Sequence, residues 1–90
     1  MTHEKLHKDL DELQSQLDRT EPRDEASRQK MDSLREGIRN AKEQEGPVSA
    51  ETGQDLRHRL EQSLESFEVS HPKLTGFVNN VINTLNSIGI

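Results

Sequence analysis

Three residues near the start of the chain have the types and the spacing of metal ligands: His3, His7 and Asp11. On an α-helix, side chains four residues apart lie one turn apart on the same face, and two histidines in this arrangement can bind zinc, nickel or copper. The three residues lie at a helix end, however, and helix ends fray. We therefore expect no resident metal and no other cofactor, and we keep His3, His7 and Asp11 only as candidate ligands.

A fourth residue whose side chain could take part in chemistry, His71, lies between Ser70 and Pro72. An imidazole titrates near neutral pH, so His71 could act as a pH switch or as a general base. The sequence fixes no nucleophile and no paired acid beside it, and Pro72 is typical of a helix start. We interpret His71 as a structural residue of a tight turn, in which the ring bonds an exposed backbone group.

The carboxylates do not form a pattern that predicts catalysis. Neighbouring acids such as Asp11 and Glu12 point about 100° apart on a helix, so both are expected on solvated surface rather than in one site. The chain also has no glycine-rich phosphate-binding loop and no Gly-x-Ser-x-Gly segment. From these observations we expect a protein without enzymatic activity.

Composition restricts the partners that the chain can bind. Seventeen acidic against twelve basic residues give a net charge of −5, so no basic face is expected for nucleic-acid phosphates. Phe67 and Phe77 are the only aromatic residues, too few for base stacking, and there is no cysteine for a disulfide or a thiolate metal site. Neither an apolar leader nor an apolar stretch long enough to span a membrane is present. We expect a cytoplasmic protein with no nucleic-acid partner.

The spacing of the apolar residues predicts an all-α fold. Four leucines are spaced by four, three and four residues, as on one face of a helix: Leu6, Leu10, Leu13 and Leu17. They place a first helix at about 3–19. A second helix, at about 22–44, begins at Pro22, because proline is tolerated in a first helical turn. The start of the second helix is almost entirely polar, so Leu13 and Leu17 need cover from the fourth helix or from another chain.

Two further helices are expected at about 50–69 and 71–88, after a linker at 46–49 that contains an adjacent glycine and proline. Their apolar residues recur at helical spacing and are expected to form the core or to bind a partner: Leu56, Leu60, Leu64, Phe67, Leu74, Phe77, Val78, Val81, Ile82, Leu85 and Ile88.

The ends of these two helices are also predicted. Ser49 is expected to cap the third helix, and Val69 to pack against Leu74 where the fourth helix begins. Gly89 is expected to adopt the left-handed conformation that ends a helix, so that Ile90 folds back on Leu85.

The chain therefore reads as one small domain, residues 1–90, with two unlike halves. A charged helical hairpin (1–45) is joined by the linker to an apolar helical hairpin (50–90). Successive helices are expected to be antiparallel, which gives an up-down helical bundle of four helices with the hairpin 50–90 as its folding nucleus.

The segment from Phe67 to Leu74, Phe-Glu-Val-Ser-His-Pro-Lys-Leu, and the ending Asn86-Ser87-Ile88-Gly89-Ile90 carry a family resemblance. They resemble the F-E-x-x-H-P-x-L segment and the N-x-G-I ending of the bacterial domain-of-unknown-function family 4404. This chain has one residue more between the asparagine and the glycine of the ending. The resemblance implies a short bacterial helical protein and supplies no catalytic residue.

The fourth helix leaves three interpretations open. Lys73 is the only formally charged residue among residues 71–90, although charged residues make up 32% of the chain. The apolar arc of this helix could close the bundle within the chain, form the seam of a homodimer, or lie on a membrane surface. We expect a protein–protein interaction or scaffold protein that forms a homodimer, with Leu13 and Leu17 as candidate oligomer contacts. The alternative is peripheral membrane-surface binding through the fourth helix.

Overall fold

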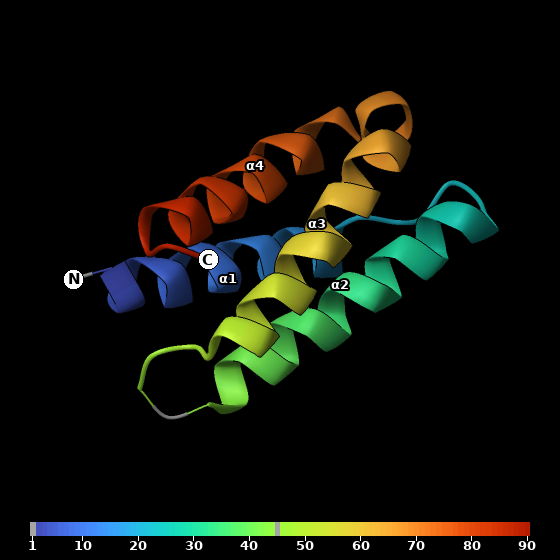
Figure 1. Cartoon of the computed structure of the whole chain (residues 1–90). Helices are drawn as coiled ribbons and strands as arrows, with labels where there is room; N and C mark the ends of the chain where they lie inside the picture. The colour runs from blue at the N-terminus through green and yellow to red at the C-terminus, as the bar shows by residue number, and fades with distance from the viewer. Residues whose placement is uncertain (1, 45) are drawn as a thin grey trace.

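Four α-helices make up the protein, as a computed structural model shows for residues 2–44 and 46–90 (Figure 1). They are α1 (Thr2–Arg19), α2 (Glu25–Glu43), α3 (Ala50–Ser70) and α4 (Pro72–Ser87). The described residues contain no strand. The predicted all-α bundle of four helices is therefore confirmed, and the only sizeable difference in bounds is that α2 begins at Glu25 rather than at residue 22.

Helix α2 begins late because Asp24 caps it. The Asp24 carboxylate accepts a hydrogen bond of 2.8 Å from the backbone N–H of Ser27, which satisfies one of the free donors of the first turn. Pro22 stays in the connection that precedes this cap. At the start of α3, the Ser49 hydroxyl accepts from the backbone N–H of Thr52 at 3.2 Å, as the sequence predicted.

The helices form a closed ring rather than a row of hairpins. Each helix packs on its neighbours in the chain, and α1 also packs on α4 (Figure 1). The contact of α1 with α4 is much more extensive than its contact with α2, whereas α2 and α3 form the closest pair. The first helix is therefore held mainly by the last one.

The apolar rows of all four helices meet in one core. The completely or almost completely buried apolar side chains are Leu6, Leu10, Leu13, Leu17, Met31, Leu34, Ile38, Ala41, Val48, Leu56, Leu60, Phe67, Leu74, Val78, Val81 and Leu85. Leu13 and Leu17 are both 0% exposed within a single chain. Of the two sources of cover that the sequence left open, the fourth helix is the one observed, because α1 packs chiefly on α4. Neither leucine lies at the surface of the single chain.

The connection between α3 and α4 differs from the prediction. Val69 is 87% exposed and does not pack in the core, so the expected contact with Leu74 is wrong. The reason is that α3 continues through Ser70, and His71 alone separates the two helices. The His71 N–H donates to the Phe67 carbonyl at 2.8 Å, and its own carbonyl accepts from the Leu74 N–H at 3.0 Å.

The end of α4 follows the predicted pattern. Gly89 has a φ of +85°, and the backbone N–H of Ile90 donates to the Leu85 carbonyl at 3.0 Å, which is the reversal that a left-handed glycine permits. The Ile90 side chain then lies against Gly53 of α3, where a Cβ atom would come within 2.4 Å of it. Arg57 donates to the Ile90 carbonyl at 2.7 Å, so the segment after α4 is fixed to α3.

Candidate interaction surface

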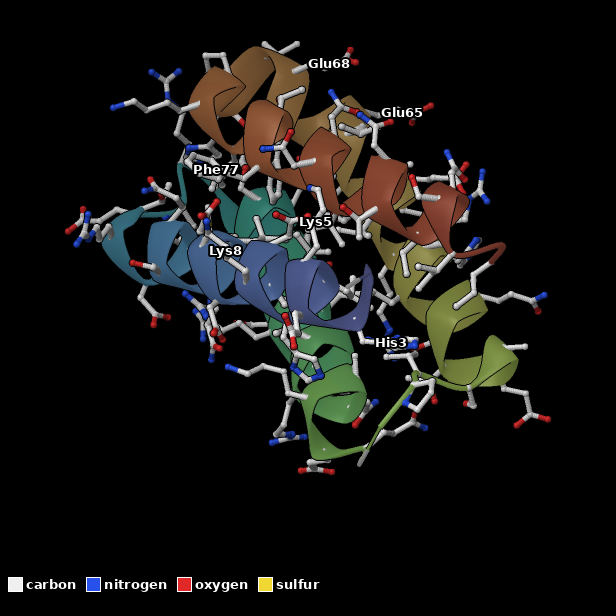
Figure 2. All side chains as sticks on the ribbon, turned by 90° about the vertical axis from the view of Figure 1, so that its left-hand side faces the viewer. His3, Lys5, Lys8, Glu65, Glu68 and Phe77 are labelled. Atoms are coloured by element: carbon white, nitrogen blue, oxygen red, sulfur yellow. The ribbon has the colours of Figure 1, made fainter. Side chains whose placement is uncertain are left out.

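The structure does not gather His3, His7 and Asp11 into a metal site. In residues 2–44 and 46–90, no three His, Cys, Asp or Glu side chains are close enough together to hold a metal ion. His3 lies between the start of α1 and the segment that leads into α3, and its Nδ1 is buried without a hydrogen-bond partner (Figure 2). Asp11 instead forms an ion pair with Lys42 of α2.

The segment His3-Glu4-Lys5-Leu6-His7 has the His-Glu-x-x-His order of zinc metalloproteases, a signal that the sequence reasoning missed. In such enzymes the two histidines bind zinc, the glutamate acts as the base, and a third protein ligand comes from elsewhere in the chain. The segment is helical, as the motif requires. Among the described residues, no third His, Cys, Asp or Glu lies close enough to complete a metal site with this segment.

His71 has a structural position, but not through the bond expected for it. Its ring lies edge-on to the ring of Phe67, with centroids 5.8 Å apart and an interplanar angle of 82°. The ring makes no capping hydrogen bond to α4, and its Nε2 is buried without a partner. Nearby, the backbone N–H and the hydroxyl of Ser27 lower the pKa of Asp24, with a smaller contribution from His71. These contacts cap α2 and pack the turn.

A buried polar cluster between α1 and α4 was not predicted. The Thr84 hydroxyl donates to the Asp9 carboxylate at 2.5 Å, and Lys5 Nζ lies 3.2 Å from the same carboxylate oxygen. Asp9 and Thr84 are 8% and 3% exposed. In the sequence, Asp9 stands three residues after Leu6, at the edge of the leucine row. This position is the signal that could have predicted its burial. The cluster ties α1 to α4.

Between α1 and α2 the surface forms an open groove of about 580 Å³. Its lining is mostly charged and of both signs: Gln14, Asp32, Arg35, Glu36, Arg39, Lys42 and Glu43. Arg35 bridges the two helices by donating to the Leu17 carbonyl at 3.1 Å and by lying 3.5 Å from Asp18. Because the opposite charges largely compensate one another, the groove does not select a ligand of one sign.

The apolar arc of α4 faces the inside of the bundle. Of the residues predicted for the core or for a partner, seven are buried: Leu56, Leu60, Phe67, Leu74, Val78, Val81 and Leu85. The other four are partly buried and pack against the core: Leu64, Phe77, Ile82 and Ile88. All eleven residues therefore lie in the core of the single chain or against it. None of the helices in the described part of the chain is both long and apolar enough to cross a membrane.

From Gly76 onward, the outer side of α4 is an exposed helix surface without a charge. We call it the amide face, and its exposed residues are Gly76, Asn79, Asn80, Asn83, Asn86 and Ser87. Lys73, the only charged residue of the helix, is also exposed and lies three residues before Gly76. In Figure 2, Lys5 and Lys8 of α1 lie on one side of α4, and Glu65 and Glu68 of α3 lie on the other. The charge depletion was visible in the sequence, but the side of the helix left to solvent was not.

Comparison with known proteins adds a family and no activity. The model of a family described as "Domain of unknown function (DUF4404)" matches residues 6–90. No curated protein and no solved structure matches the chain.

Proposed function

The chain belongs to the DUF4404 family, whose function is unknown, and from that premise we propose that it is a non-enzymatic helical protein–protein interaction module. The observation that carries this proposal is the amide face of α4. It is a continuous exposed surface without a charged side chain, on a protein in which 32% of the residues are charged.

The physical reason lies in the cost of removing polar groups from water. A charged side chain loses much more solvation free energy than an amide when a partner covers it. The centres of protein interfaces are accordingly depleted in charged residues. An asparagine amide also has both donors and an acceptor, so it can re-form with a partner the hydrogen bonds that it made with water. The amide face therefore suits a protein partner better than the charged groove does.

The alternative of membrane-surface binding finds less support. It depends on an apolar helix face that is free to enter a bilayer. On α4 this face contains Leu74, Val78 and Val81, which are at most 1% exposed. The outward side has amides and no basic residues apart from Lys73, so it offers little to lipid tails or to anionic headgroups.

The test compares two amide-to-acid substitutions at exposed positions. Asn83→Asp lies on the amide face, whereas Gln29→Glu lies on α2, which does not contact α4 in the described residues. Tagged full-length chains are used to capture and quantify proteins from the source organism. We expect Asn83→Asp to lose partners that the parent and Gln29→Glu retain. Identical sets of captured proteins for all three chains contradict a role for this face.

The non-enzymatic part of the proposal is tested with zinc, because His3, Glu4 and His7 have a metalloprotease order. We expect one equivalent of zinc to leave the melting temperature unchanged, since the described residues supply no third ligand. A rise in melting temperature that disappears in a His3→Ala variant would show that the segment binds zinc. That result would contradict the proposal and favour a zinc-dependent hydrolase instead.

A further inference from the structure

Three glycines lie within helices, and two of them have a reason inside the chain. At Gly37 of α2, a Cβ atom would lie 2.8 Å from the Arg59 side chain and 3.2 Å from that of Leu56. At Gly53 of α3 it would lie 2.4 Å from Ile90. Both glycines therefore permit a close approach between helices or chain segments. Each helix-interior glycine otherwise costs about 1 kcal/mol relative to alanine.

Gly76 of α4 has no such reason. It is exposed on the amide face, and a Cβ atom there would have nothing within 4 Å. It still lowers the stability of the helix, and no contact within the chain offsets that cost. At the other two helix glycines, the missing Cβ leaves room for a neighbour. Close approach of a second backbone to this surface would explain the glycine at position 76 in the same way.

The charge of the protein indicates which partner fits. The chain carries a net charge of −5, so two copies repel one another over most of their surface. The amide face is the exception, because it contributes no charge. Its asparagines are also self-complementary, since each has donors and an acceptor that can pair with the same side chain of another copy. A second copy of this chain therefore meets the least repulsion at α4.

The flanks of the face select the orientation. Glu65 and Glu68 on the α3 flank form no ion pair within residues 2–44 and 46–90, and neither does Lys8 on the α1 flank (Figure 2). The α1 flank carries Lys5 and Lys8 beside Glu4, Asp9 and Glu12, so two of its three acids are offset and it is less acidic than the flank with Glu65 and Glu68. In one twofold arrangement, the α1 flank of each copy meets the α3 flank of the other, so lysines face acids in both halves of the interface. In the other arrangement, each flank meets the same flank of the second copy, so the acids of α3 face one another.

We propose that the amide face of α4 is the interface of a weak twofold homodimer, in which the backbones approach at Gly76 and Lys8 of each copy faces Glu65 and Glu68 of the other. This rests on the proposed function, whose partner it names. A helix of this length is about 24 Å long. The exposed face of one such helix therefore buries much less than the roughly 800 Å² per partner of a standard interface. The flanks on α1 and α3 must therefore contribute, and the dimer forms only at high concentration.

The first test separates dimerisation from folding. Gly76→Gln replaces glycine by a better helix former in open space, so the monomer is expected to melt at a higher temperature. The larger side chain blocks close approach, so sedimentation equilibrium up to about 1 mM protein is expected to show a dissociation constant raised at least about tenfold. A parent that stays monomeric over this range, or a Gly76→Gln chain that dimerises as well as the parent, overturns the homodimer.

The second test uses charge reversal and mixing. Lys8→Glu alone and Glu65→Lys with Glu68→Lys are each expected to weaken self-association about tenfold, because like charges then face one another. An equimolar mixture of the two variants is expected to associate again, since both contacts between unlike copies are complementary. Arg39→Glu, the matched reversal on α2, should change nothing. A mixture that associates no better than either variant alone overturns the orientation and the proposal.

The two proposals can fail separately. If the parent is monomeric but Asn83→Asp still loses captured proteins, the amide face binds a different protein and the homodimer is wrong. If neither self-association nor capture depends on the face, the proposed function is wrong as well.

Discussion

Helix α1 is held by different kinds of contact on its two sides. Towards α4, the Asp9 carboxylate is almost fully buried and accepts hydrogen bonds from Thr84 and Lys5. Towards α2, only two residues further along, the Asp11 side chain is 61% exposed and pairs with Lys42 at the edge of an open groove. The same residue type thus occurs in a buried cluster and in a solvated ion pair on one helix.

The difference teaches that position relative to the core decides what a carboxylate contributes. An exposed ion pair gains little, because water and salt screen it and two long side chains must be ordered. A buried carboxylate depends on its partners, because an unsatisfied polar group in the interior is costly. We therefore expect the α4 side of α1 to determine stability and the α2 side to tolerate change.

The largest effect is expected from breaking the α4 side entirely. Val81→Asp places a charge at a position that is 0% exposed and has no counter-charge in the apolar arc. The expected cost is about 3–5 kcal/mol, enough to unfold a small domain. Circular dichroism during heating measures it, with Asn83→Asp on the outer side of the same helix as the control. If the two variants melt alike, the inner face of α4 is not the core.

A smaller effect is expected at the buried cluster. Thr84→Val keeps the shape of the side chain but removes the hydroxyl that donates to Asp9, which costs about 1–3 kcal/mol. Ser87→Ala is the matched control, because both hydroxyls also donate to the carbonyl four residues earlier, but Ser87 is exposed. Urea denaturation of both variants gives the free energies of unfolding. Equal losses would show that the bond to Asp9 contributes nothing.

The smallest effect is expected on the α2 side. Asp11→Ala removes the ion pair with Lys42, and the loss should stay within about 0.5 kcal/mol because the carboxylate is mostly in water. Asp9→Ala, measured in the same way, should cost distinctly more. A loss at Asp11 as large as that at Asp9 would remove the contrast between the two sides of α1.

The sequence predicted the local features of this fold well. The leucine spacing predicted α1, and the Ser49 cap and the Gly89 ending were correct, because each depends on a few neighbouring residues. The exposure of Val69 was not predicted, since it depends on whether α3 stops at residue 69 or continues one residue further.

The long-range features were less accessible. Lys5 and Asp9 have the spacing of any exposed ion pair on a helix, and only the approach of Thr84 from α4 buries the carboxylate. Likewise, the order of His3, Glu4 and His7 does not reveal whether a third ligand arrives from elsewhere. The candidate surface was predicted only as a charge-poor segment, because a helix with apolar and amide sides does not indicate which partner covers either side.

The pairing of α1 with α4 has a consequence for how the chain could be rearranged. The start of α1 and the end of α4 lie at the same end of the bundle (Figure 1). A circular permutant that joins these ends and opens the chain between Thr20 and Asp24 would keep every helix pair and cut only the least packed connection. In that permutant α4 and α1 become a local hairpin, so the lower contact order should speed folding.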